Sequence, residues 1–132
     1  MFKEIQKSRK SKVFGIITIA ALTFGIGSNV FAGSSYTTIK AVSDGEDGPT
    51  AYMSKGSVSM SGANYDTSNN SLWVELYRNV TGPDVRVGGK ELNIESSSSW
   101  SHENGSSGNY YVHLDPDGPY YTGCNGWGQA VR

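Results

Sequence analysis

The residues of this chain whose types and spacing suit chemistry best are aromatic. Trp73 and Tyr77 each lie two positions from Glu75 in the segment Ser71–Val80, where apolar and polar residues alternate. Side chains two positions apart point to the same face of a β-strand, so this spacing predicts a flat aromatic strip with a carboxylate between the rings. Flat rings with polar edges suit contact with a sugar ring or with a partner protein.

Four further aromatic side chains near the C-terminus are candidates for the same surface. The segment Gly108–Gly128 predicts a β-hairpin with a turn at Asp115–Gly118, followed by a glycine-rich loop at Gly123–Gly128. The candidates in this segment are Tyr111, Tyr120, Tyr121 and Trp127. Packing within the scaffold is the alternative role for rings such as Trp73 and Trp127, because the aliphatic core is small.

The sequence predicts no catalytic site and no cofactor. The two histidines are His102 and His113, and no serine stands in a G-x-S-x-G motif that would position a nucleophile. A glycosidase needs two carboxylates at a fixed separation, and Glu75 together with acids scattered over loops does not predict such a pair. We therefore expect that the protein is not an enzyme.

Two acidic segments, Asp44–Gly48 and Asp115–Gly118, carry oxygen ligands of the kind that bind calcium. The second segment lacks the acid that an EF-hand has at its twelfth position, where this chain has Gly126. Aspartate and glycine are also the residues that turns use, so both segments are interpreted as turns and no metal site is predicted. Calcium binding by these loops is the alternative.

Cys124 is the only cysteine, so the chain cannot form an internal disulfide. In an exported protein, an unpaired cysteine is either a free thiol or half of an intermolecular bridge. The preferred interpretation is a small residue packed beneath the glycine-rich loop of a monomer. A covalent dimer through Cys124 is the alternative.

The elements that must position these residues are β-strands. Residues 33–132 carry glycine, serine, asparagine or aspartate in every window where a helix could form, and the apolar residues alternate instead. The sequence therefore predicts an all-β fold, a small antiparallel β-sandwich of about seven short strands in one domain. The expected strands are Tyr36–Ser43, Ala51–Ser61 with a break at Gly56, Ser71–Val80, Val85–Val87, Lys90–Glu95, Gly108–Leu114 and Pro119–Thr122.

Several connecting segments are also predicted. Gly88-Gly89 is expected to form the tight turn of a hairpin. Gly62–Asn70 and Ser101–Ser107 are expected to be polar loops, and Ser96–Ser99 a flexible or edge-like segment. Because the aliphatic core is small, Tyr110 is expected to point inward with its strand neighbours and to serve structure.

The first 32 residues predict a signal peptide. A basic region at residues 2–12 precedes the apolar segment Val13–Phe24, and the small residues Val30 and Ala32 follow. This order predicts cleavage after Ala32 and a secreted, extracellular protein with no membrane anchor after cleavage. A retained anchor is the alternative, although the apolar segment is shorter than the roughly 20 residues that a span needs.

Removal of this leader changes the charge of the protein. The whole chain has a formal net charge of −1, whereas residues 33–132 hold six basic and eleven acidic residues, a net charge of −5. Nucleic-acid binding needs a basic face that neutralises phosphates, so nucleic acid is excluded as an expected partner.

The sequence thus predicts a secreted, non-enzymatic binding protein of bacterial type with an aromatic contact surface. The expected partner is a cell-wall polysaccharide or an extracellular protein. The alternative is a secreted antimicrobial factor, bacteriocin-like or toxin-like, although the negative charge disfavours simple disruption of anionic membranes.

Overall fold

The computed structural model of the chain describes residues 33–117 and 121–132. The predicted signal peptide and its cleavage site after Ala32 lie outside the described residues, and so does Tyr120. The described residues belong to one compact unit, Ala32–Arg132. Within them all regular secondary structure is β-strand, and no helix is long and apolar enough to cross a membrane.

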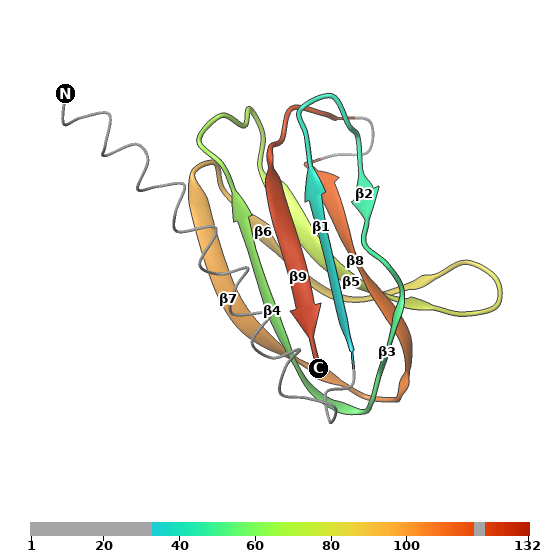
Figure 1. Cartoon of the computed structure of the whole chain (residues 1–132). Coiled ribbons are helices and arrows are strands. Elements are labelled where there is room, and N and C mark those ends of the chain that lie inside the picture. The colour runs from blue at the N-terminus through green and yellow to red at the C-terminus, as the bar shows by residue number, and fades with distance from the viewer. Residues whose placement is uncertain (1–32, 118–120) are drawn as a thin grey trace. The chain divides into compact units, whose positions relative to one another are not determined.

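Nine strands form two antiparallel sheets in the described part of the chain (Figure 1). Sheet A has the strand order β1-β9-β4-β7, and sheet B has the order β2-β8-β5-β6, with β3 also paired to β8. The strands are β1 (Ser34–Ile39), β2 (Glu46–Asp47), β3 (Ala51–Met53), β4 (Gly56–Asn64), β5 (Leu72–Asn79), β6 (Val85–Leu92), β7 (Ser96–Asn104), β8 (Gly108–Pro116) and β9 (Gly126–Val131). The predicted fold class, a small antiparallel β-sandwich, is confirmed.

The core lies between the two sheets and follows the predicted alternation. Leu72, Val74 and Leu76 of β5 are fully buried, and Val112 of β8 lies beside them. Tyr110 is only 1% exposed, and its hydroxyl donates a hydrogen bond to the carbonyl oxygen of Ser106 at 2.6 Å. Its ring therefore fills the core while its polar end is satisfied, as expected for a sandwich with few aliphatic residues.

Glycines on the inner face of sheet A bring the two sheets close together. A Cβ at Gly128 of β9 would lie 2.7 Å from Cδ2 of Leu114 and 2.9 Å from Cγ1 of Val74. Real Cβ atoms do not approach carbon atoms this closely, so the large side chains of sheet B occupy the space that a side chain of β9 would need. Gly128 therefore serves strand packing.

The expected turn at Gly88-Gly89 is wrong. β6 runs without a break through both glycines and pairs along its length with β5, with a β-bulge between Leu76 and Tyr77. Close contacts, and not a turn, explain these glycines: a Cβ at Gly89 would lie 2.7 Å from a guanidinium nitrogen of Arg86. The β5–β6 hairpin closes earlier, through residues 80–84.

Two segments expected to be polar loops are partly strand, although residues 65–70 lie outside any strand, as expected. β4 continues to Asn64, and β7 includes the serine run and most of the segment that follows it. β7 pairs with β4 over nine residues at the edge of sheet A, so only the edge-like character of Ser96–Ser99 is confirmed. Polar composition hid β7, because its exposed positions are mostly serines.

The predicted C-terminal hairpin is also wrong. β8 pairs with β5, β2 and β3 within sheet B, whereas the chain after it crosses to sheet A. There Gly126–Val131 forms β9 between β1 and β4 (Figure 1). The break predicted at Gly56 is confirmed, because this residue separates β3 from β4 with φ of 126°.

Candidate functional site

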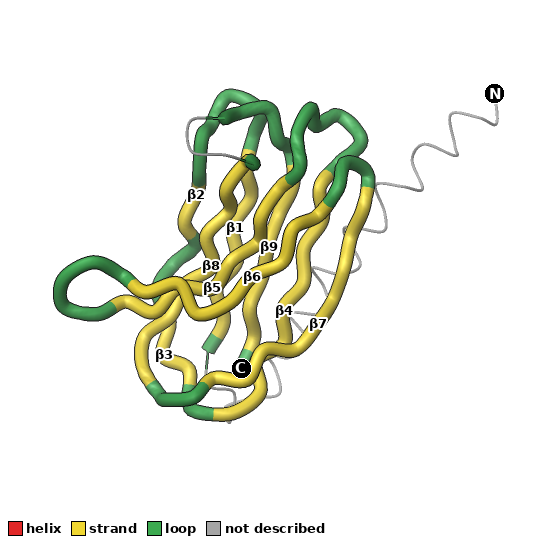
Figure 2. The backbone as a smooth tube through the Cα atoms, turned by 180° about the vertical axis from the view of Figure 1, so that it is seen from behind, coloured by secondary structure: helices red, strands yellow, loops and turns green. Residues whose placement is uncertain are grey.

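The outer face of sheet B gathers the aromatic side chains of two neighbouring strands. β5 carries Trp73, Glu75 and Tyr77 on this face, and in the β5–β8 register Glu75 lies opposite His113 and Tyr77 opposite Tyr111. We call Trp73, Glu75, Tyr77, Tyr111 and His113 the aromatic strip. Figure 2 shows β5, β6 and β8 from the side of sheet B on which this strip lies.

The rings of Tyr77, Tyr111 and His113 are in contact. The Tyr77 and Tyr111 rings are stacked with their centroids 5.7 Å apart and an interplanar angle of 17°. The His113 ring meets Tyr77 edge-on at 5.3 Å. These arrangements are among the favourable geometries for aromatic pairs, so each ring helps to hold its neighbour in place.

Glu75 lies at the centre of the strip and is buried. Its Oε2 accepts a hydrogen bond from Nε of Arg86 on β6 at 2.6 Å, and its side chain is only 9% exposed. The guanidinium carbon of Arg86 also lies 5.5 Å from the centroid of the Trp73 ring. Oε1 of Glu75 is buried and has no hydrogen-bond partner. An unsatisfied buried polar atom costs about 1–3 kcal/mol, so this atom is a specific feature of the face.

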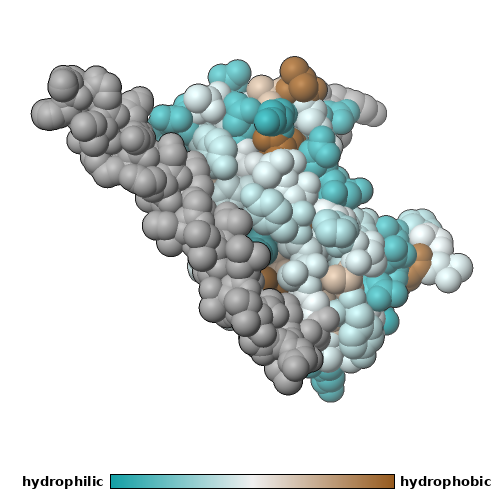
Figure 3. Space-filling model, viewed as in Figure 1, coloured by the Kyte–Doolittle hydropathy of each residue, from teal (hydrophilic) through white to brown (hydrophobic). Residues whose placement is uncertain are grey.

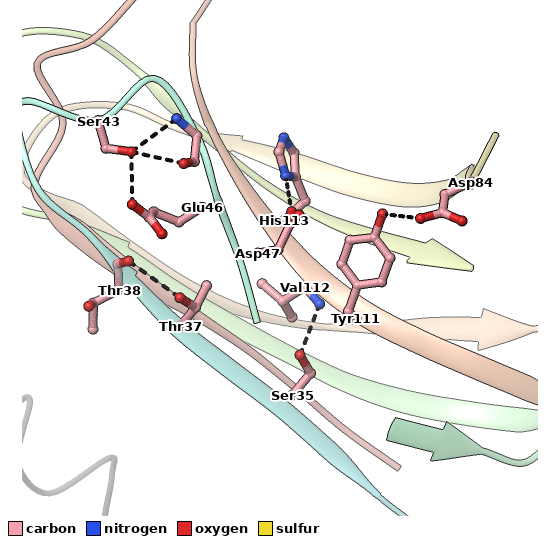
Figure 4. Close-up of polar contacts among 11 residues, drawn as sticks. Ser35, Thr37, Thr38, Ser43, Glu46, Asp47, Asp84, Tyr111, Val112 and His113 are labelled. Atoms are coloured by element: carbon pink, nitrogen blue, oxygen red, sulfur yellow. Dashed lines mark hydrogen bonds and ion pairs between the residues drawn. The ribbon is translucent and has the colours of Figure 1, made fainter. Parts of the chain in front are cut away.

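Two acids outside β5 and β8 orient the rings of the strip. Asp47 of β2 lies opposite His113, and its Oδ1 is 2.6 Å from Nδ1 of that histidine. The hydroxyl of Tyr111 donates a hydrogen bond at 2.7 Å to Oδ2 of Asp84, in the β5–β6 loop. Figure 4 shows both contacts. Burial and this hydrogen bond raise the pKa of Tyr111, so its hydroxyl remains a donor at neutral pH.

Asp115 extends the strip along β8. It is two residues beyond His113 on the same face, and it lies opposite Trp73 in the β5–β8 register. Burial raises the pKa of Asp115, and the charge of Glu75 adds to this effect. One ligand atom each from Glu75, His113 and Asp115 lies within 4.8 Å of the others. Sequence analysis missed this cluster, because the register that brings Glu75 to His113 is not visible in either strand alone.

The structure adds a tyrosine to this face that the sequence analysis did not select. Tyr52 of β3 lies opposite Asn109 of β8, and Asn109 is on the same face of β8 as Tyr111. Tyr52 is 54% exposed. In the sequence, Tyr52 alternates in step with Val58 and Met60, which are buried. The break at Gly56 shifts this alternation by one residue, so that Met53 is buried and Tyr52 is exposed.

Trp127, another predicted contact residue, is not brought to the strip. Trp127 lies on β9 in sheet A, where it is 3% exposed and its ring centroid is 6.0 Å from that of Tyr36. The expectation of an exposed ring in a glycine-rich loop is therefore wrong for Trp127. Tyr121 is 56% exposed in the segment before β9, and Tyr120 lies outside the described residues.

The outer face of sheet A has a different character. Serines alternate along β4 and β7 on this face, with Ser59 opposite Ser101 and Ser61 opposite Ser99. Figure 3 shows the visible surface over β9 and β1 mainly in pale and teal colours, which mark weakly polar and hydrophilic residues. Among the described residues, sheet A exposes the ring of Tyr36, whereas the outer face of sheet B carries the exposed Tyr52 and the half-buried Trp73, Tyr77 and Tyr111.

Cys124 is buried within the described unit. Its thiol donates hydrogen bonds to the carbonyl oxygens of Asn70 at 3.2 Å and Ser71 at 3.4 Å. Burial raises the pKa of the thiol. A buried, neutral thiol fits a monomer better than a covalent dimer.

Comparison with known proteins identifies no family for this chain. No family model matches the sequence. No curated protein matches it either. Similar solved structures include PirA, with a TM-score of 0.49 at 8% identity over 75% of this chain and 93% of that chain. A CBM4 structure has a TM-score of 0.49 at 9% identity, over 76% of this chain and 72% of that chain.

A third solved structure is the CBM36-1 domain of a multidomain xylanase from the hindgut metagenome of Trinervitermes trinervoides. Its TM-score is 0.43 at 14% identity, over 76% of this chain and 87% of that chain. At such identities and TM-scores these matches assign no function.

Proposed function

We propose that this protein is a secreted, non-enzymatic binding protein whose aromatic strip contacts a cell-wall polysaccharide. The observation that carries the proposal is the placement of Trp73, Tyr77 and Tyr111 on one sheet face, on neighbouring strands. An extracellular protein is the other partner that this surface suits, because aromatic residues dominate the energetics of protein interfaces.

The neighbours of the rings favour a sugar. Two amide side chains, Asn79 and Asn109, are exposed and lie opposite each other at the Tyr77 and Tyr111 end of the strip. Amides donate and accept hydrogen bonds, as sugar hydroxyls do. Rings that present an apolar surface beside such groups match a sugar, which has an apolar face and a polar rim.

The strip is held in place before a ligand arrives. Asp84 holds the hydroxyl of Tyr111, and stacking against Tyr77 restrains both rings. Association costs about 0.5–1.5 kcal/mol for each flexible side chain that it immobilises. Rings already ordered by the sheet avoid part of that cost.

The contacts of the polar residues support a role other than catalysis. Glu75 is committed to Arg86 and is nearly buried, which disfavours its use as a general acid or base. His113 and Asp47 form the histidine-aspartate half of a nucleophile-activating triad. Among the described residues, however, no serine or cysteine side chain hydrogen-bonds to the His113 ring.

The proposal is tested by pull-down on insoluble cell wall and on purified wall polysaccharide. We expect Trp73→Ala and Tyr77→Ala each to weaken retention by more than about fivefold, because an anchor residue contributes more than about 1 kcal/mol. The control is Tyr36→Ala, which removes a ring that is 39% exposed on the opposite sheet.

Two results would contradict the proposal. One is equal retention of the wild type and of the two strip variants. The other is the absence of retention by any wall, polysaccharide or cell fraction. Inhibition of related bacteria at low concentration, without wall retention, would favour the antimicrobial alternative.

A further inference from the structure

Three side chains with metal-ligand chemistry meet on the outer face of sheet B: Glu75 and His113 of the aromatic strip, and Asp115 next to it. β8 places His113 and Asp115 two residues apart on the outer face of sheet B, and the register with β5 places Glu75 opposite His113. One ligand atom from each of the three lies within 4.8 Å of the others. We propose that Glu75, His113 and Asp115 form a binding site for a divalent transition-metal ion, such as Zn²⁺.

Glu75 gives independent support for a ligand at this point. Its side chain is more than nine-tenths buried, and its two carboxylate oxygens differ. Oε2 is held by Arg86 on β6, which flanks β5 on the side away from β8. Oε1 is buried and has no hydrogen-bond partner, so it is the oxygen left for a further ligand. A cation bound between β5 and β8 would satisfy it.

His113 is oriented as a metal-binding histidine usually is. Its Nδ1 lies 2.6 Å from Oδ1 of Asp47 on β2. Histidines that ligate a metal through one ring nitrogen almost always engage a carboxylate, a carbonyl or water through the other. Asp47 therefore fixes the ring and leaves the lone pair of Nε2 for the ion.

The donor set selects the class of ion. One imidazole and two carboxylates suit Zn²⁺ and its neighbours among the transition metals, whereas Ca²⁺ takes six to eight oxygen ligands. Three protein ligands leave a fourth position of a tetrahedral ion open. That position would accept water or a hydroxyl group of a bound molecule.

The metal site does not depend on polysaccharide binding. Its ligands are held by contacts within the protein, to Arg86 and Asp47, and a metal titration needs no second partner. The aromatic rings of Trp73 and Tyr77 contribute no ligand. Either proposal therefore stands if the other fails.

The test is calorimetric titration of the purified, tag-free chain with ZnCl₂ after removal of metals by a chelator. We expect one ion per chain, and we expect CaCl₂ to bind at least tenfold more weakly. His113→Gln and Asp115→Asn should each weaken Zn²⁺ binding at least tenfold. Asp47→Asn, which changes only the support of His113, should weaken it about 10–100-fold.

The matched control is the other histidine of the chain. His102 lies on β7 in sheet A, so His102→Gln should leave the affinity for Zn²⁺ unchanged. Circular dichroism checks that every variant is folded. Co²⁺ gives a second readout, because its visible absorption reports direct ligation, and we expect His113→Gln to alter this spectrum while His102→Gln preserves it.

Three results would overturn the proposal. They are no Zn²⁺ binding by the wild type at 1:1 stoichiometry, a loss of binding in His102→Gln, and unchanged affinity in folded His113→Gln and Asp115→Asn. Wall retention is then measured with and without chelator. Loss of retention in Trp73→Ala with Zn²⁺ affinity intact separates the two sites, and Zn²⁺ binding without any wall retention refutes only the proposed function.

Discussion

Glu75 is a charged residue that the fold buries on the outer face of sheet B. It alternates with Leu72, Val74 and Leu76, so its side chain points away from the core. The whole residue is nevertheless only 7% exposed. Its neighbours on the outer face, above all Arg86, cover it. A carboxylate shielded in this way depends on its partner, since a charge loses the stabilisation of water when it is buried.

Removal of Arg86 should therefore destabilise the fold. We expect Arg86→Met to lower the free energy of unfolding by about 1–3 kcal/mol, because Glu75 is left without its charged partner. The estimate is below that for a fully buried pair, since the Arg86 side chain is 42% exposed. Urea denaturation at neutral pH measures the change.

The matched control is another cation of β6. Lys90 is exposed and donates a hydrogen bond to the Ser98 hydroxyl at 2.7 Å. Lys90→Met should lower the free energy of unfolding by less than about 1 kcal/mol, as is usual when an exposed polar contact is lost. Equal costs for Arg86→Met and Lys90→Met would contradict a special role for the pair with Glu75.

Cys124 should make stability depend on alkaline pH. Burial raises the pKa of its thiol above the ordinary value of 9.0. The folded state therefore holds the thiol proton more tightly than the unfolded state. This contribution to stability is complete below the ordinary pKa and is lost as the pH rises towards the folded value. Urea denaturation from pH 7.5 to 10 should show a decline that is smaller in Cys124→Ala.

Chemical modification gives a second check on Cys124. A buried thiol should react slowly with a thiol reagent in buffer and rapidly in urea. Non-reducing electrophoresis should give a monomer band alone. Fast labelling of the native protein, or a dimer band that reductant removes, would show that the thiol is accessible.

At the scale of elements, glycine serves strand packing more than turns. The expectation of a turn at Gly88-Gly89 was wrong because a glycine can be required by a close side chain as well as by a turn. Gly126 and Gly128 are a second example, because the sequence predicts a loop at these glycines and the structure places both in β9. Only the contacts in the folded structure distinguish these cases.

Gly128 allows a direct test of this packing. We expect Gly128→Ala to lower the free energy of unfolding by about 1–3 kcal/mol, because the added methyl group would overlap Leu114 and Val74 in the core. Thermal or urea denaturation measures the loss. In Gly105→Ala the new methyl group meets no heavy atom within 4 Å, so this control should be close to neutral. A neutral Gly128→Ala would show that the sheets can separate to accept it.

For the whole molecule, export from the cell is a prediction of the N-terminal sequence. The basic region at residues 2–12 and the apolar segment Val13–Phe24 predict export, and the small residues Val30 and Ala32 predict cleavage after Ala32. Mass spectrometry of culture supernatant should find a protein that begins at Gly33. A chain that keeps its N-terminus in the membrane fraction would contradict secretion.

The sequence alone determined the fold class and the strongest strands. Period-2 alternation predicted β5 and β8, including the inward Tyr110 and the outward Trp73 and Tyr77, because the direction of a strand side chain is a local property. The sequence could not predict which strands are neighbours. Strand pairing depends on residues far apart in the chain and on the fit between two sheets.

Tertiary structure alone decided which residues share a surface. It placed Trp127 on the opposite sheet, added Tyr52 to the outer face of sheet B, and brought Glu75 to His113. The proposed metal ligands are divided between β5 and β8, so they do not occur at a short, fixed spacing in the sequence that would form a recognisable motif. The physical reason is that register, set by the packing of the whole sandwich, determines which side chains meet across strands.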